Sequence, residues 1–251
     1  MGKVISYRSG MSNGYFVRGE DGVIAVDTGA EHGEEYVRQY LREAGIKPQE
    51  IKLMVITHGH VDHFMNVQAW HDVVNMPVLC HVAAARFLEE GLLPDEDLEG
   101  RTKMGREMWE AQKKMGNPIL AASRFHPDIV IGEDTDLKEW GVDGTLVCTP
   151  GHTRGCISVV VGEEAIVGDL FAAPAHTDAV GMNYFQFLGA PYELSQNSVQ
   201  KLLDRGVRIF WPGHGTSRDA DYVRQKLEEE KAGKEMYYTL EELHQMEQQE
   251  A

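Results

Sequence analysis

The stretch from Thr57 to His63 concentrates side chains that can bind a metal ion. It places three imidazoles and one carboxylate within six residues, namely His58, His60, Asp62 and His63. Neutral imidazole is the commonest metal ligand in proteins, and a carboxylate is a good partner for Zn²⁺. By itself so short a motif is also compatible with a polar turn that carries solvent-exposed histidines.

Three later residues occur in one shared local context, at the end of an apolar run and beside a glycine. His152 follows the run LVCT, Asp169 follows AIV, and His214 follows RIF. Each alone would more often be a turn or capping residue, but a glycine-flanked turn at a strand end also lets side chains converge on one point. Together with the first stretch they give seven candidate ligands.

Seven ligands are too many for one tetrahedral zinc ion, but they suit two adjacent ions that share a carboxylate. Two ions about 3.5–4 Å apart would lower the pKa of a bridging water toward neutrality and make it a hydroxide nucleophile. No serine or cysteine nucleophile is then required. Zn²⁺ is the first choice for its redox inertness, although iron or manganese could use the same ligands.

The N-terminal half must supply strands that present these side chains. The residues from Tyr15 to Asp27 predict a β-hairpin, and Ile51 to Thr57 is a continuous apolar run that predicts a buried strand. A further strand is predicted from Pro77 to Cys80. Helices are predicted from Gly33 to Ala44, where Gly45 ends the helix, and from Ala83 to Glu90.

The second half is rich in predicted strands and ends in helices. The strands are expected at Asp128–Ile131, Gly144–Thr149, Cys156–Val161, Ala165–Val167 and Arg208–Trp211, and the helices at Glu193–Arg205 and from Ser217 onward.

One compact domain over residues 1–251 is the expectation, with a helical insertion at about 95–125 and a helical tail at about 217–251. Met104, Met108 and Met115 fall along one side of the insertion, which favours core packing, although a Met-rich face can also line a pocket. The insertion and the tail could each cover the site or form a contact in a homodimer.

Composition narrows the classes of function. The 251 residues are 42% hydrophobic and 25% charged, as in ordinary globular proteins, and the net charge of −16 disfavours a nucleic-acid partner. Cys80, Cys148 and Cys156 have no CxxC spacing, which favours a reduced, cytoplasmic compartment. No apolar run of about 18 residues and no secretory signal occurs, so neither a membrane span nor export is expected.

The order HxHxDH, Gly-His, Gly-Asp and Pro-Gly-His resembles the metallo-β-lactamase superfamily over most of the chain, from Asp27 to His214. The resemblance implies an α/β fold, an αββα four-layer sandwich with the metals at one edge of two packed sheets. It assigns His58, His60 and His152 to the first metal. The second metal would take Asp62, His63 and His214, Asp169 would bridge the two, and Asp27 would orient a ligand by hydrogen bonding rather than bind metal.

The resemblance also implies a reaction, in which a bridging metal-bound hydroxide attacks a carbonyl while Asp62 helps position the water and could move its proton. Asp169 stands where one antibiotic-hydrolysing subclass has a cysteine, so the chain looks closer to glyoxalase-II-like thioesterases and lactonases than to β-lactamases. The expected substrate is a small ester, lactone or thioester. Phe64 to Asn66 replaces the small glycine-rich turn common in glyoxalase II, which weakens a glutathione thioester in particular.

Several alternatives remain open within the same fold. They are a phosphodiester hydrolase, which should need a basic exosite, a mononuclear-iron persulfide-dioxygenase-type enzyme, a β-lactamase, and a protein that binds metal without catalysis. An aromatic-rich loop after Asp169 could form a substrate wall, in which Tyr184 or His176 would polarise a carbonyl or stabilise a leaving group, although packing is the simpler role for both. Cys148 and Cys156 are expected to be small core residues.

Overall fold

The computed structural model describes residues 2–92, 98–100, 103–115, 122–172, 181–182, 185–187 and 193–232. The first of its two large sheets has the order β1-β2-β3-β4-β5-β7. Its strands are β1 (Lys3–Ser9), β2 (Ser12–Arg18), β3 (Val23–Val26), β4 (Ile51–Val55), β5 (Val78–His81) and β7 (Ile129–Ile131). The β1-β2-β3 part is antiparallel and the β3-β4-β5-β7 part is parallel. The hairpin predicted at Tyr15–Asp27 is thus confirmed as β2 and β3.

The second sheet has the order β16-β15-β11-β10-β9-β8. Its strands are β8 (Thr135–Asp136), β9 (Thr145–Cys148), β10 (Ile157–Val161), β11 (Glu164–Gly168), β15 (Ile209–Pro212) and β16 (Arg218–Asp219). Neighbouring strands run antiparallel except β11 and β15, which are parallel. Because β11 and β15 are parallel, both end at the same edge of the sheet.

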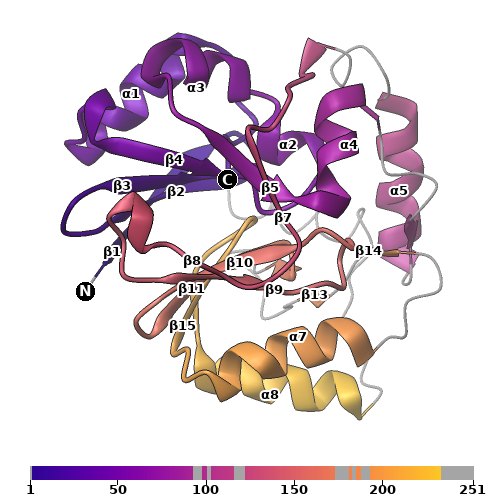
Figure 1. The fold of residues 1–251 in the computed structure, drawn as a ribbon. Helices are drawn as coiled ribbons and strands as arrows, with labels where there is room; N and C mark the ends of the chain where they lie inside the picture. Colours follow the sequence, from indigo (N-terminus) through magenta and orange to yellow (C-terminus); the bar gives the residue numbers. More distant parts are fainter. Residues whose placement is uncertain are drawn as a thin grey trace, which may run out of the picture.

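Helices cover the outer face of each sheet, as Figure 1 shows, with α1 and α3 over the first sheet and α7 and α8 under the second. The helices are α1 (Glu34–Ala44), α2 (Val61–Phe64), α3 (Val67–Val74), α4 (Val82–Glu90), α5 (Lys103–Met115), α7 (Glu193–Asp204) and α8 (Ala220–Lys231), with short 3-10 turns η1 (Pro48–Glu50) and η2 (Lys138–Trp140). The predicted αββα arrangement is therefore confirmed.

The core is divided into three layers by the two sheets. Val23 and Ala25 of β3 pack toward the helices, whereas the alternate residues Ile24 and Val26 pack between the sheets. A third apolar cluster, which includes Phe210 of β15, lies between the second sheet and α7 and α8. Because both faces of these strands are buried, the strands have continuous apolar sequences rather than alternating ones.

Several elements differ from the sequence-based prediction. The first strand, β1, and the helix α3 were not predicted, and the segment expected to be a helical insertion contains the strand β6 (Leu98–Gly100) as well as α5. Strand β6 pairs with β14 (Phe185–Phe187), and β12 (Phe171–Ala172) pairs with β13 (Gly181–Met182), so the segment after Asp169 is partly strand. These short strands depend on pairing with distant residues, which local sequence does not encode.

The start of the C-terminal helix was also placed too early. Residues 218–219 form β16, and α8 begins at Ala220, because the side chain of Asp219 accepts a hydrogen bond from the backbone N–H of Tyr222 at 2.8 Å. This is the usual N-terminal cap of a helix. The rest of the predicted tail, residues 233–251, lies outside the described residues, and the single-domain organisation stays a prediction. Among the described residues no helix has the length and apolar character needed to cross a membrane.

Candidate metal centre

The seven residues predicted as ligands all lie just after strands, and the two sheets bring them to one place. His58 and His60 follow β4, and Asp62 and His63 belong to the short helix α2 that comes next. From the second sheet come the remaining three, His152 after β9, Asp169 at the end of β11, and His214 after β15. Both halves of the chain are therefore needed to assemble the cluster.

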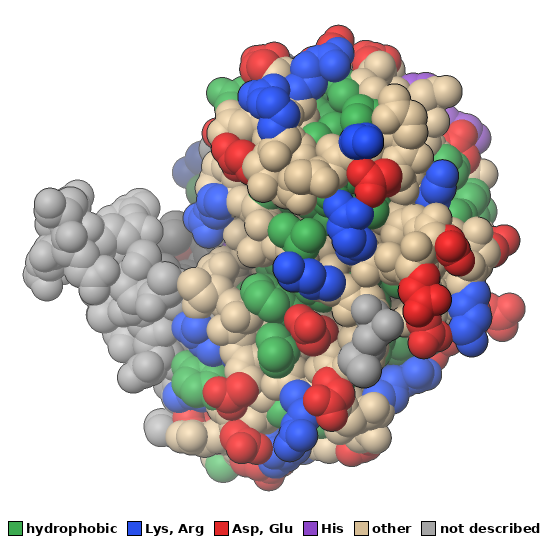
Figure 2. Space-filling model, turned by 90° about the vertical axis from the view of Figure 1, so that its left-hand side faces the viewer, with side chains coloured by type: hydrophobic (Ala, Val, Ile, Leu, Met, Phe, Trp, Pro, Cys, Tyr) green, Lys and Arg blue, Asp and Glu red, His purple; other side chains and the backbone are tan. Residues whose placement is uncertain are grey.

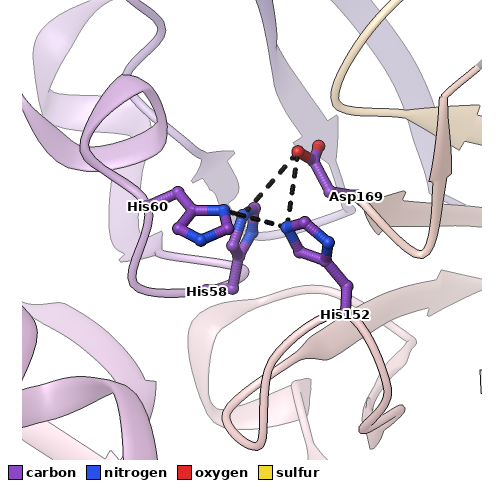
Figure 3. Close-up of side chains that lie close together, drawn as sticks. All are labelled: His58, His60, His152 and Asp169. Atoms are coloured by element: carbon purple, nitrogen blue, oxygen red, sulfur yellow. Dashed lines mark hydrogen bonds and ion pairs between the residues drawn. The ribbon is translucent and has the colours of Figure 1, made fainter. Parts of the chain in front are cut away.

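The first group consists of His58, His60, His152 and Asp169, whose ligand atoms all lie within 4.8 Å of one another. Nδ1 of His60 is 3.1 Å from Nε2 of His58 and 2.9 Å from Nε2 of His152. Figure 3 shows the three rings turned toward one another and toward the carboxylate of Asp169. All three rings are buried.

The second group consists of Asp62, His63 and His214, whose ligand atoms also lie within 4.8 Å of one another. Oδ2 of Asp62 is 3.5 Å from Nε2 of His63 and 3.2 Å from Nε2 of His214. His63 is fully buried, but the side chains of Asp62 and His214 are 18% and 28% exposed. The second group is thus the one that solvent can reach.

Asp169 contacts both groups. Its Oδ2 is 3.8 Å from Nε2 of His58 and 3.7 Å from Nε2 of His152, and also 3.3 Å from Nε2 of His214. Its Oδ1 is 3.3 Å from Nε2 of His63. This carboxylate therefore lies where it could be shared between two ions.

Asp27 lies behind the cluster and contacts Thr57 and His63. Its carboxylate accepts hydrogen bonds from the backbone N–H and the hydroxyl of Thr57, both at 2.8 Å, and its Oδ2 is 2.7 Å from Nδ1 of His63. The hydroxyl of Thr57 is in turn 3.1 Å from Nδ1 of His58. Asp27 therefore contacts a ligand candidate from the side away from the cluster.

Two features of this network were not found from the sequence. Thr57 joins Asp27 to His58, and its place at the end of the apolar run, directly before His58, was a signal that could have revealed it. Asp27 also has a left-handed backbone (φ 57°), which is uncommon outside glycine and tolerated best by Asp and Asn. Such strained residues tend to cluster at functional sites.

Burial keeps the histidines of the first group neutral. It lowers the pKa of His60 to about 4 and that of His152 to about 3. The pKa of His58 is held well below its usual value by burial and by the charge of His63. A neutral imidazole has a free lone pair at neutral pH, which is the form that binds a cation.

The second group has the opposite electrostatic character. Burial disfavours protonation of His214, but Asp169 and Asp62 outweigh it and raise the pKa of His214 to about 10. The same carboxylates, with Asp27, raise the pKa of His63 well above its usual value. Burial likewise opposes ionisation of Asp62 and Asp169, yet His63 and His214 lower the pKa of both carboxyls. The carboxylates of this group therefore favour the protonated, positively charged forms of His63 and His214.

The donor set fits a divalent cation. Nε2 of His63 and Oδ1 of Asp169 are buried, and neither makes a hydrogen bond within the described part of the chain. Buried polar atoms in native proteins nearly always make a hydrogen bond. These two atoms instead face one another as an ion pair at 3.3 Å, an arrangement in which both could also bind a cation. Imidazole nitrogens with carboxylate oxygens are the ligands that zinc, iron and manganese use.

Two glycines allow the close approach of the segments. A Cβ on Gly213 would lie 2.3 Å from Oδ1 of Asp169 and 2.6 Å from Cε1 of His63, and a Cβ on Gly151 would lie 2.0 Å from Oγ of Ser195 on α7. The first contact involves two ligand candidates directly. The glycines beside His152 and His214 are therefore required by space.

Tyr184 and His176, which the sequence offers as substrate contacts, lie outside the described residues. Cys156 is buried as expected, and its sulfur accepts a hydrogen bond from the backbone N–H of Thr153. Cys148 is only half-buried, because it lies in β9 near one edge of the second sheet, where β8 is short.

Comparison with known proteins finds proteins of similar sequence and solved structures of similar fold. A probable metallo-hydrolase of Methanocaldococcus jannaschii is 24% identical over 212 residues, which are 83% of this chain and 89% of the relative. Among solved structures, the B3 metallo-beta-lactamase BLEG-1 has a TM-score of 0.66 at 19% identity and covers 90% of this chain and 97% of its own. A protein solved in a di-iron-bound form has a TM-score of 0.60 at 18% identity, covering 89% and 97%.

The structural neighbours, at these identities, show a shared fold, and the His/Asp cluster is one that could hold divalent metal. Superfamily membership supports a hydrolase activity. The sequence profile of the metallo-beta-lactamase superfamily matches residues 7–214, which include Asp27 and all seven ligand candidates. The chain belongs to the metallo-beta-lactamase superfamily.

Proposed function

We propose that this protein is a hydrolase that works with two divalent metal ions, with Zn²⁺ as the first choice, and cleaves a small ester, lactone or thioester. The observation that carries the proposal is the division of the cluster into two compact groups, with Asp169 in contact with both. One tetrahedral ion would leave several of these candidate ligands unused.

The candidate ligands would hold the two ions in two sets that share Asp169. His58, His60 and His152 would hold the first ion, Asp62, His63 and His214 the second, and Asp169 both. When bound, such ions polarise a substrate carbonyl and lower the pKa of a water molecule. Asp27, through Nδ1 of His63, fixes which ring nitrogen of that histidine faces the cluster.

Asp62 is the residue best placed to handle a proton. Its carboxylate is partly exposed, whereas the histidines of the first group are buried. The charges of His63 and His214 keep the pKa of Asp62 low, so it is ionised at neutral pH and can accept a hydrogen bond from the attacking water. Substrate would approach from this exposed side. A role for Tyr184 in contacting substrate remains a proposal.

The distribution of charged side chains on the surface favours a small-molecule substrate over a nucleic acid. On the face seen in Figure 2, Lys and Arg side chains are interspersed with Asp and Glu and do not gather into a patch. The net charge of −16 points the same way, because phosphate backbones are bound by clustered cations. Phosphodiester hydrolysis is therefore the less favoured alternative. A cytoplasmic location and a homodimer stay predictions.

The complete second group argues against a mononuclear-iron enzyme. Asp62, His63 and His214 lie within 4.8 Å of one another, as a second ion would require. The relative solved with two irons keeps iron as an alternative metal within the dinuclear arrangement. β-Lactam hydrolysis is kept as an alternative because BLEG-1 is a B3 metallo-beta-lactamase.

The test combines metal analysis with a substrate panel. Protein purified without chelators is analysed for metals per chain and assayed on thioesters, lactones, β-lactams and phosphodiesters, before and after metal removal. Two zinc ions with chelator-sensitive turnover of a carboxylic ester or thioester would support the proposal. His214→Ala should lose this turnover, while His126→Ala, at an imidazole that is 84% exposed, should keep it. One iron per chain without hydrolysis would contradict the proposal.

A further inference from the structure

The turn between β1 and β2 lies against the second group. The two strands pair from Lys3 with Arg18 to Ser9 with Ser12, and only Gly10, with a left-handed backbone (φ 59°), and Met11 connect them. Ser12 and Asn13 follow at the start of β2, and both are buried although they are polar. Buried polar side chains need partners, and here the partners lie about 50 and 200 residues away in the sequence.

Asn13 binds the backbone on both sides of His214. Its Nδ2 donates to the carbonyl oxygens of Pro212 and Gly215, both at 2.9 Å, and its backbone N–H donates to the carbonyl of Gly213 at 2.8 Å. The hydroxyl of Tyr15 donates to the same Pro212 carbonyl at 2.5 Å. Strand β2 therefore holds the loop that carries His214 at three carbonyls on either side of that residue, those of Pro212, Gly213 and Gly215.

The turn also contacts the side chain of His214 and the backbone of Asp62. Nδ1 of His214 is 2.9 Å from the carbonyl oxygen of Met11. A carbonyl only accepts hydrogen bonds, so Nδ1 carries the proton and Nε2 faces the carboxylates. The hydroxyl of Ser12 donates to the carbonyl of Asp62 at 2.9 Å. The same turn therefore reaches two of the three members of the second group.

We propose that the β1–β2 hairpin is the positioning element of the second group, and that Asn13 is its principal positioning residue. The inference rests on the proposed two-ion function and adds that the two ions depend on different supports. The first group is held elsewhere, because the turn before His152 accepts a hydrogen bond at the carbonyl of Pro150 from Ser198 of α7, at 2.7 Å. Loss of Asn13 should therefore weaken one ion selectively.

The experiment measures the two zinc affinities by competition with a chromophoric chelator. Asn13→Ala should weaken the second ion by about 10–100-fold, the range typical when a group that orients a metal ligand is removed, and should leave the first ion unchanged. Tyr15→Phe should weaken it less, because Nδ2 of Asn13 still donates to Pro212. Ser198→Ala is the matched control and should affect the first ion instead. Equal affinities in wild type and Asn13→Ala would overturn the proposal.

A purely structural role for Asn13 predicts a different pattern. It would lower the melting temperature of the metal-free protein and leave both zinc affinities unchanged, and that outcome also overturns the proposal. If Asn13→Ala does not fold, Tyr15→Phe decides by the same comparison of the two affinities.

A second readout does not need metal. Exchange of the Nδ1 proton of His214 is followed by nitrogen-15 NMR in metal-free protein. It should be slow in wild type and faster in Asn13→Ala, while equal exchange rates would contradict the hairpin's role. If wild type binds fewer than two ions, the proposed two-ion function fails, and the exchange rates alone decide the inference about the hairpin.

Discussion

Oδ2 of Asp27 lies 2.7 Å from Nδ1 of His63, and this contact fixes a ring whose other nitrogen faces the cluster. Because Asp27 also accepts two hydrogen bonds from Thr57, one carboxylate orients the segment that leads to His58 as well as the ring of His63.

Asp27→Asn tests this carboxylate with little change of shape. Asn tolerates the left-handed backbone found at this position, so the fold should be kept. Its amide can no longer accept all three hydrogen bonds, so metal affinity should fall by about 10–100-fold, with a comparable loss of kcat/KM. Metal affinity and activity are measured together, with the exposed Asp21→Asn as control. Wild-type affinity in Asp27→Asn would contradict the assigned role.

Gly213→Ala should disrupt the candidate metal centre by steric overlap alone. The added Cβ would lie 2.3 Å from Oδ1 of Asp169, which must move away together with its neighbours. We expect activity to fall by more than about 100-fold, since small displacements of catalytic groups have effects of that size. Gly132→Ala is the control, because its Cβ would meet nothing closer than 3.8 Å. Circular dichroism of both variants checks that they fold, and a Gly213→Ala enzyme of normal activity would refute the expectation.

Metal removal should lower stability. A ligand that binds only the folded state stabilises it by about 2.7 kcal/mol when present at 100 times its dissociation constant. The carboxylates of Asp62 and Asp169 lie 3.2 and 3.3 Å from the same nitrogen of His214, and a cation would offset the repulsion between them. Scanning calorimetry with chelator and with excess zinc should show a clearly lower melting temperature without metal. The same difference is expected for His126→Ala, and identical melting temperatures with and without metal would argue against the site.

The three thiols should differ in reactivity. Burial raises the pKa of Cys80 to about 12 and that of Cys156 to about 12, so almost no thiolate of either forms at pH 8. Because the thiolate is the reactive form, a thiol reagent should label native protein only at the half-buried Cys148, and slowly, since burial and Asp134 raise its pKa as well. Mass spectrometry counts the labels, with denatured protein expected to take three. Rapid labelling of Cys80 in native protein would show that the core opens.

The candidate ligands were predictable because each lies at the point where an apolar run ends. The run at Ile51 to Thr57 places His58 shortly after β4, which ends at Val55, and Asp169 directly follows β11. The division of the seven residues into two groups came from the resemblance to a family. The geometry now shows two such groups.

What the sequence did not reveal depends on contacts between distant segments. Asn13 could not be recognised as a support of the His214 loop, because its partners are about 200 residues away. The pairing of β6 with β14 is equally non-local, and β16 was missed because a two-residue strand has no pattern of its own. Local sequence patterns predict individual strands and helices, but they do not predict which of these pair or pack with one another.

The seven residues come from both sheets, four from the segment after β4 and three from the strand ends of the second sheet. Neither half of the chain alone holds a complete set. The free energy of coordination is therefore available only to molecules in which the two sheets have already docked. A bound ion would act as a clamp between the halves, slowing their separation and coupling the unfolding of one to the other.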